Sequence, residues 1–234
     1  MKIIVKANEQ KEIFIDNNAS LDFVLENNAS LLLKYAIFNN IKNITINGKL
    51  KKNAVLKAAM ADFSNGKAKV NASIELDDIG ANANWDLASL ATGSDQKQFD
   101  ISFIHNHQRT IANMNNYGVA LNSSRLVFSG INYIKKKAKK SQTNQNAKII
   151  VFDQNASGKA NPILKIDEND VLASHAAIVG RLNDEHLFYL KSRGLNEKEA
   201  KALIVNGYLK PIANHFESKT KLRIEKMIQE KCHV

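Results

Sequence analysis

Histidines are the side chains in this sequence best suited to binding a transition metal. His105 and His107 are separated by one residue, and His175 lies further along the chain. A neutral imidazole can ligate iron or zinc, and residues i and i+2 of a strand point to the same face. No neighbouring cysteine or carboxylate completes a ligand set with His105 and His107, so a surface or interface pair is the competing interpretation. For His175, the local residues alone favour a packed histidine.

Other reactive groups do not form a recognisable catalytic set. The adjacent carboxylates at Asp77–Asp78 and Asp167–Glu168 have no partner that identifies a reaction, and such pairs are usually solvated turn residues. Ser174 and His175 would point to opposite faces of a strand, so they do not make a dyad. Neither a nucleophile elbow nor a phosphate-binding glycine loop is present in the sequence. We therefore predict that the chain is not an enzyme.

Composition limits the remaining function classes. The 234 residues carry a net charge of +10 and one cysteine, Cys232, which rules out an intrachain disulfide and a thiolate metal site built by this chain alone. The lysines are scattered apart from the cluster at Lys135–Lys140, whereas nucleic-acid binders concentrate their charge, so we expect no nucleic-acid partner. The sequence shows neither a signal-peptide pattern nor a long apolar run, so we expect a cytoplasmic protein without membrane contact.

Short apolar runs separated by turn residues dominate the sequence up to about residue 175. Runs of three to five residues, rich in β-branched side chains and bounded by Asn, Gly, Asp or Ser, are typical of strands. The tripeptide Asn-Ala-Ser begins at residues 18, 28, 71 and 155, and its first two copies are ten residues apart. This spacing indicates a β-sandwich, a barrel or a solenoid. Val55–Asp62 is a candidate short helix within this region.

The pattern changes to helical after residue 182. Asn183 and the acidic residues Asp184 and Glu185 precede a short apolar run, and Gly194 is a typical signal for the end of this first helix. Asn196 and Glu199 have the spacing of a capping box, which predicts a second helix that Gly207 ends or lets pack closely. A third helix is expected to begin near Pro211. We divide the chain into a β core, residues 1–182, and a helical domain, residues 183–234.

The stretch from Asn161 to Gly207 carries ordered motifs of a known family. In order, these are Pro162-x-Leu164-x-Ile166, Asp170-Val171, Ser174-His175, Val179-Gly180-Arg181, Leu187-Phe188-Tyr189-Leu190 and Ser192-Arg193-Gly194-Leu195. Together they resemble the C-terminal core of the SufB/SufD family, which serves iron–sulfur cluster assembly. A weaker similarity extends upstream through residues 99–101, 117–119 and 127–130.

The resemblance implies a right-handed parallel β-helix followed by a short helical domain. It also implies pairing with a second SufB/SufD-type core and docking of the ATPase SufC on the C-terminal helices. The residues implied in that docking are Leu187, Phe188, Tyr189, Arg193, Gly194, Leu203 and Gly207. The partners would be a SufB-like subunit and a SufC-like ATPase, or a second copy of this chain.

Two positions resemble the SufD branch more than the SufB branch. SufB-like chains carry a cysteine in a stretch that corresponds here to Thr143–Asn146, which has no thiol, and a Glu where Ala176 follows His175. The functional histidine of SufD-like chains corresponds to His175, with His105 as a second candidate. The implied cargo is a transient iron–sulfur cluster at a subunit interface, because this chain alone holds no cofactor stably.

Two hypotheses from other classes compete with this reading. The first is a structural β-solenoid that self-assembles without any metal. The second is a β-helix hydrolase of polysaccharides, which would need two carboxylates at a suitable separation in a groove. The sequence identifies no such pair.

Overall fold

Two parallel β-sheets form most of the molecule. The computed structural model describes residues 1–17, 19–40, 43–182 and 184–232. The first sheet contains β1 (Lys2–Val5), β3 (Leu21–Leu25), β5 (Asn43–Leu50), β7 (Lys67–Leu76), β9 (Gln96–His105), β11 (Arg125–Ile134) and β13 (Ser157–Ile166). The second contains β2 (Gln10–Ile15), β4 (Ser30–Ile37), β6 (Val55–Asp62), β8 (Asn82–Ala91), β10 (Ile111–Ala120), β12 (Ser141–Val151) and β14 (Val171–Arg181).

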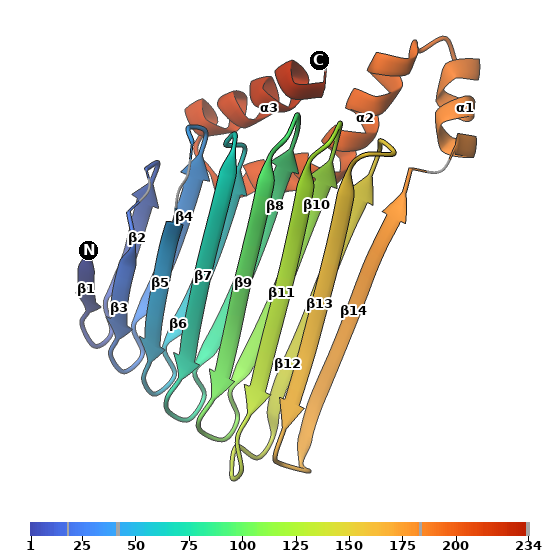
Figure 1. Ribbon diagram of the computed structural model, residues 1–234. Coiled ribbons are helices and arrows are strands. Elements are labelled where there is room, and N and C mark those ends of the chain that lie inside the picture. Colours follow the sequence, from blue (N-terminus) through green and yellow to red (C-terminus); the bar gives the residue numbers. More distant parts are fainter. Residues whose placement is uncertain (18, 41–42, 183, 233–234) are drawn as a thin grey trace.

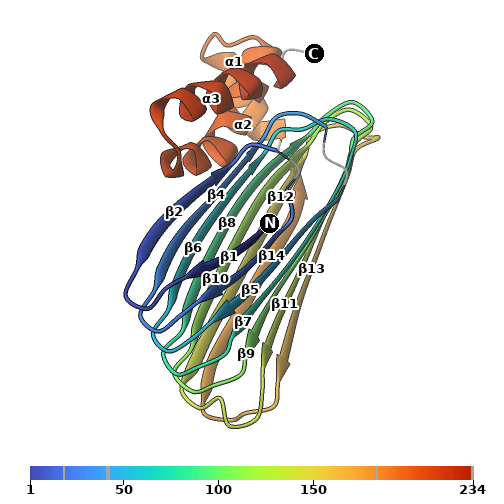
Figure 2. The same cartoon turned by 90° about the vertical axis from the view of Figure 1, so that its left-hand side faces the viewer.

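The chain alternates between the two sheets at every turn and so winds as a coil. Each strand pairs in parallel with the strand two places along the chain, as β7 does with β9 and β10 with β12. Figures 1 and 2 show the resulting stack of coils. The predicted fold class, a mainly β parallel solenoid followed by helices, is confirmed.

Asparagines make many of the turns, which explains their abundance. Asn8, Asn28, Asn53 and Asn122 have positive φ angles between 53° and 62°, a region that Asn tolerates better than most residues. Their side chains also bond from coil to coil: Asn28 Nδ2 donates to Asn8 Oδ1 at 3.1 Å, and Asn53 Nδ2 donates to Asn28 Oδ1 at 3.2 Å. The same residue type therefore serves the turn and the stacking of the coils.

Apolar side chains from both sheets fill most of the interior. Trp85, Phe99 and Phe128 are almost fully buried, and the last two rings meet edge to face with centroids 5.7 Å apart. One ion pair is also enclosed, with Lys97 Nζ 2.8 Å from Asp62 Oδ2. Burial works to raise the pKa of Asp62, but the charge and hydrogen bond of Lys97 outweigh it and lower the pKa.

The described helices pack against one end of the outer face of the second sheet. These are α1 (Asp184–Ser192), α2 (Glu197–Leu209), the 3₁₀ helix η1 (Lys210–His215) and α3 (Ser218–Cys232). A second hydrophobic cluster joins Val205 and Ile228 of the helices to Phe63 and Leu90 at the upper end of the sheet. Figure 2 shows the helices on that side, while the outer face of the first sheet carries no helix among the described residues.

The helical segment agrees with the predicted boundaries in part. Asn196 accepts from the Glu199 amide and Glu199 accepts from the Asn196 amide, so the capping box is present. Gly207 does not end α2, which continues to Leu209. The expected third helix is two elements, because the chain becomes extended at Phe216 between η1 and α3.

The helix expected at Val55–Asp62 is wrong: this segment is strand β6. Its alanines favour a helix in isolation, but backbone pairing with β4 and β8 overrides that preference. Two other expectations, the first Asn-Ala-Ser copy at Asn18 and the helix signal at Asn183, fall on residues outside those described. Among the described residues, no helix is long and apolar enough to span a membrane.

Candidate functional site

The solenoid ends at two edge strands, β13 and β14. Among the described residues, no strand pairs with the outer edge of either one. We call the surface formed by these two strands the open end. Several apolar side chains stand exposed there, namely Ile163, Ile166, Leu172, Ile178 and Val179. An edge with unpaired backbone and exposed apolar side chains is a template for binding another chain.

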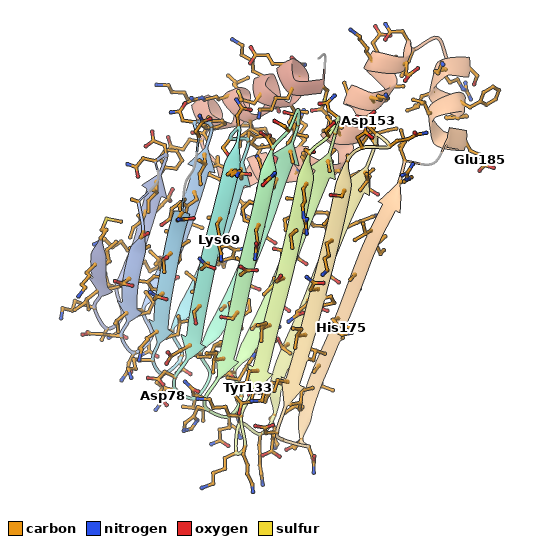
Figure 3. The ribbon with its side chains drawn as sticks, in the orientation of Figure 1. Lys69, Asp78, Tyr133, Asp153, His175 and Glu185 are labelled. Atoms are coloured by element: carbon orange, nitrogen blue, oxygen red, sulfur yellow. The ribbon has the colours of Figure 1, made fainter. Side chains whose placement is uncertain are left out.

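His175 lies on β14, within the open end (Figure 3). Its register partner on β12 is Gln145, which is aligned in turn with Met114 and then Trp85. All three of these partners are buried, so this row of side chains faces the interior of the coil. His175 shares the inward direction but is exposed, because no further coil lies over it in the part of the chain that the structure describes.

The interior beneath His175 is polar rather than apolar. Gln145 is 2% exposed, and its Nε2 donates to the carbonyl of Ile163 at 3.2 Å. Nearby in the same coil, the Asn132 side-chain amide donates to the Thr143 hydroxyl, which itself donates to the carbonyl of Ala112 at 3.1 Å. The carbonyl oxygens of the Gln145 and Asn132 side chains are buried without a hydrogen-bond partner. Buried polar groups normally have partners, so this layer, Asn132, Thr143 and Gln145, retains unused acceptors.

His105 lies elsewhere, at the last position of β9. Its ring is fully buried, and Nδ1 is 2.7 Å from the Thr110 hydroxyl. Nε2 is enclosed without a partner. Burial lowers the pKa of His105 to about 4, so the ring is neutral at physiological pH. Because β9 lies two strands inward from β13, the structure does not place His105 beside His175 at the open end.

The proposed pairing of His105 with His107 does not form. Strand β9 ends at His105, and His107 is exposed in the following turn. Among the residues that the structure describes, no group of three or more His, Cys, Asp or Glu side chains has the arrangement of a metal site. Cys232 is buried, and burial raises the pKa of its thiol to about 12, so it is not a thiolate.

The adjacent carboxylates take part in local contacts outside the strands. Asp77 Oδ2 lies 2.6 Å from Lys51 Nζ, and the Tyr133 hydroxyl donates to Asp167 at 2.6 Å. Neither contact has the form of an acid/base pair, in which two carboxylates face a shared cleft.

The helical residues of the predicted partner surface divide between α1 and α2. Phe188 is 74% exposed and Tyr189 is 55% exposed, and the Arg193 guanidinium lies 5.2 Å from the Tyr189 ring centroid. Leu203 is also exposed, on α2. Leu187 is half-buried, and Gly194 ends the α1 turn with a φ of +93°. Such a set of exposed aromatic and aliphatic side chains is typical of a protein-binding surface.

Gly207 borders a groove between the helices and the second sheet. The groove has a volume of ≈ 430 Å³, and its walls include Tyr117, Lys148 and Tyr208. His215 Nε2 lies 3.4 Å from Asp86 Oδ2 across it. A side chain at position 207 would meet no atom within 4 Å, so the glycine is not required by local packing.

Sequence reasoning missed Gln145 and the other polar interior residues. Thr143–Asn146 was read only for its lack of a thiol. Residues 141–146 are polar throughout, so the sequence carries no apolar alternation that could have placed Thr143 and Gln145 inside the coil, and their alternating burial is visible only in the structure.

Comparisons with known proteins agree with this architecture. The family model described as "SUF system FeS cluster assembly, SufBD core domain" matches residues 5–208. The protein named "Iron-sulfur cluster assembly protein SufD" from Bacillus subtilis is 37% identical over 125 residues, which are 53% of this chain and 29% of that protein.

Mycobacterial relatives are more distant. An "Iron-sulfur cluster assembly SufBD family protein" from Mycobacterium tuberculosis is 30% identical over 152 residues, 64% of this chain and 18% of the relative. One from Mycobacterium leprae is 25% identical over 202 residues, 84% of this chain and 23% of the relative. The chain thus spans less than a third of the length of these relatives.

Proposed function

The chain belongs to the SufB/SufD family of the SUF iron–sulfur cluster assembly system and is SufD-like, and from this premise we propose that it acts as a non-catalytic scaffold subunit. The observation that carries the proposal is the position of His175. It faces the interior of the coil from a strand that no further coil covers among the described residues. A partner laid on the open end would enclose this imidazole at the interface.

We assign the open end to a SufB-like core, with a second copy of this chain as the alternative occupant. The edges of β13 and β14 supply unpaired backbone groups over 10 and 11 residues. Leu172 and Ile178 would lose their water contact in such an interface, and burial of apolar area is the main driving force of association. Strand addition at a sheet edge is a common mode of recognition.

His175 would act there as one ligand or as a local base for the cluster that is being built. Neutral imidazole donates a nitrogen lone pair to iron. One histidine does not hold a cluster, so the other ligands must be thiolates of the partner or the sulfide of the cluster itself. The cluster is cargo in this account, and the chain keeps no cofactor of its own.

His105 stays a secondary candidate. Its Nε2 has no protein partner, which leaves a lone pair or a proton unused. The ring is enclosed, however, so iron would reach it only through an opening of the interior. We therefore base the proposal on His175.

We assign the exposed side of α1 and α2 to a SufC-like ATPase. Phe188, Tyr189 and Leu203 offer exposed apolar area, and Arg193 adds a cation beside the Tyr189 ring. Aromatic residues and arginine are the side chains most enriched at the energetic centres of interfaces. This surface lies on α1 and α2 and the open end lies on β13 and β14, so the two proposed partners would bind different elements of the chain.

Reconstitution with the SufB-like and SufC-like subunits of the same organism tests the proposal. We expect native mass spectrometry to show a complex containing all three chains. Phe188→Ala with Tyr189→Ala should remove only the ATPase, and substitutions on β14 should remove only the SufB-like core. A wild-type chain that binds neither subunit would contradict the proposal.

The competing self-assembly hypothesis is supported by one observation, since a solenoid has edge strands at both ends. Head-to-tail stacking of β1 and β2 on β13 and β14 would produce open filaments. Sedimentation of the chain alone distinguishes the two accounts, because filaments grow with concentration and a scaffold subunit stops at a defined size.

A further inference from the structure

Four cations gather on the outer face of the first sheet. Lys67 and Lys69 come from β7, Arg125 from β11 and Lys159 from β13. All four side chains are exposed, and they line a single depression with a volume of ≈ 490 Å³. We call this depression the cationic groove. Lys69 is labelled in Figure 3 on the sheet that carries no helix.

Strand register explains how residues so distant in sequence come together. Lys67 on β7 is aligned with Gln96 on β9, which is aligned with Arg125 on β11. Lys67 and Arg125 are therefore two strand spacings apart, ~10 Å at the usual distance between strands. Lys69 is aligned through β9 and β11 with Lys159, three steps or ~14 Å away. Because side chains alternate between faces, all of these positions point outward.

The charges of the cationic groove are not neutralised by the protein. Among the described residues, none of these four exposed cations makes an ion pair or a side-chain hydrogen bond, and no carboxylate lines the groove. A fifth lysine, Lys97, also lines the groove, but its ammonium is buried and pairs with Asp62 at 2.8 Å. Lysines elsewhere differ: Lys49 on β5 lies 3.5 Å from Glu75, and Lys51, just after β5, lies 2.6 Å from Asp77. Clustered like charges destabilise a folded protein unless a ligand of opposite charge offsets them.

The remaining walls of the groove supply neutral hydrogen-bond donors. Side-chain amides and a hydroxyl come from Gln96, Gln98, Ser129 and Asn161. Gln98 donates to Asp100 at 2.7 Å, and Asp100 lies two residues further along β9, outside the lining of the groove. No aromatic ring lines the groove, so it offers no platform for stacking a nucleobase.

We propose that the cationic groove binds a compact ligand with two or more phosphate groups. The spread of the cations, ~10 to 14 Å, suits several linked anionic groups better than one orthophosphate. Lysine and arginine beside amide donors match phosphate oxygens. This inference stands on the first sheet alone and does not depend on the proposed scaffold function.

Isothermal titration of the full chain with inorganic tripolyphosphate tests the proposal. We expect one saturable site, with orthophosphate at least about tenfold weaker and affinity that falls as salt rises. Adenosine triphosphate should bind about as tightly as tripolyphosphate, because nothing in the groove recognises the base. The variant with Lys67, Lys69, Arg125 and Lys159 all changed to Gln should lose at least about tenfold in affinity.

A matched control removes four charges from the loop between β11 and β12. Lys135, Lys136, Lys139 and Lys140 are all exposed there, and their replacement by Gln changes the net charge by the same amount. This control should bind tripolyphosphate within about twofold of the wild type. An equal loss in the control, no saturable binding by the wild type, or equally tight binding of a hexaglutamate peptide would overturn the proposal.

Discussion

The two ends of the solenoid are built differently. At the N-terminal end, β1 and β2 have only 4 and 6 residues, and β2 carries Lys11 and Glu12. At the open end, β13 and β14 have 10 and 11 residues, and the only Lys, Arg, Asp or Glu of β14 is Arg181, its last residue. β13 carries Lys159 and Lys165, so the contrast in charge lies between β2 and β14. Short, charged edge strands discourage pairing with other chains, whereas a long strand with a single charge at its end invites it.

The helical region sharpens this difference. The Phe14 ring on β2 is 47% exposed but packs edge to face against Phe216, with centroids 6.2 Å apart, so the helical region contacts the outermost strand at the N-terminal end. The apolar side chains Leu172 and Ile178 on β14 are exposed. The comparison teaches that the two ends differ in the length of their edge strands, and this difference supports the proposed binding of a partner at the open end. It also weighs against head-to-tail stacking, because the edge strands of the two ends do not match in length, and β2 and β14 do not match in charge.

The largest expected effect comes from charging the open end. Leu172→Lys with Ile178→Lys removes two apolar side chains that a partner would bury, worth about 4 kcal/mol together, or roughly a thousandfold in affinity for the SufB-like core. Sedimentation or calorimetry of the reconstituted pair measures this loss. Circular dichroism should show an intact fold, since both positions are already exposed.

Met1→Lys with Ile4→Lys is the matched control at the other end. These side chains are 57% and 55% exposed, close to the 68% and 55% of Leu172 and Ile178. Affinity should stay within about twofold of the wild type. If the control weakened binding as much as the β14 variant did, the proposed difference between the ends would be lost.

The second prediction concerns the buried histidine of the interior. The pKa of His105 is about 4 in the folded chain and 6.5 when unfolded, so below pH 6.5 only the unfolded state gains a proton at this site. The contribution of His105 to the free energy of unfolding therefore has its full value above pH 6.5 and falls by about 3 kcal/mol on acidification to pH 4.

Urea denaturation at a series of pH values measures this change. His105→Gln should flatten the pH dependence over that interval, whereas His175→Ala should leave it in place. A wild-type chain whose stability does not fall in that interval would contradict the neutral, enclosed state of His105.

A smaller effect is expected for the exposed histidine of the open end. His175→Ala should reduce the iron and sulfide recovered on the reconstituted complex by about tenfold, with assembly unchanged, because a ligand is lost but no packed side chain. Metal analysis and visible absorption measure the cluster. His107→Ala is the control, since that histidine is also exposed but lies in a turn outside the open end. Equal losses in both variants would argue against a specific role for His175.

The smallest expected effect lies in the helices. Asn196→Ala removes the side chain that caps α2, at a cost of about 1 kcal/mol. The loss should appear as faster amide exchange in α1 and α2 and weaker binding of the SufC-like ATPase. Exchange in the strands and binding at the open end should not change.

Local signals in the sequence predicted local structure well. Asn196 and Glu199 gave the start of α2, and the Asn-rich turns indicated short strands in a solenoid, a sandwich or a barrel. Ordered motifs around His175 identified the family. Each of these signals operates over a few residues, where propensity and capping chemistry decide the conformation.

Features that depend on register could not be predicted in the same way. Lys67 and Lys159 read as scattered lysines and meet only because β7, β9, β11 and β13 stack in a fixed alignment. The inward direction of Gln145 and the strand at Val55–Asp62 also follow from neighbouring coils. Long-range backbone pairing decides these features, and a single sequence records it weakly.

The most direct test of the central claim is amide hydrogen exchange of the full chain, alone and with its SufB-like partner. The account predicts new protection in residues 157–166 and 171–181, with no change in residues 2–5 and 10–15. Protection confined to β1 and β2, or a complex that leaves β13 and β14 exchanging as in the free chain, would contradict it.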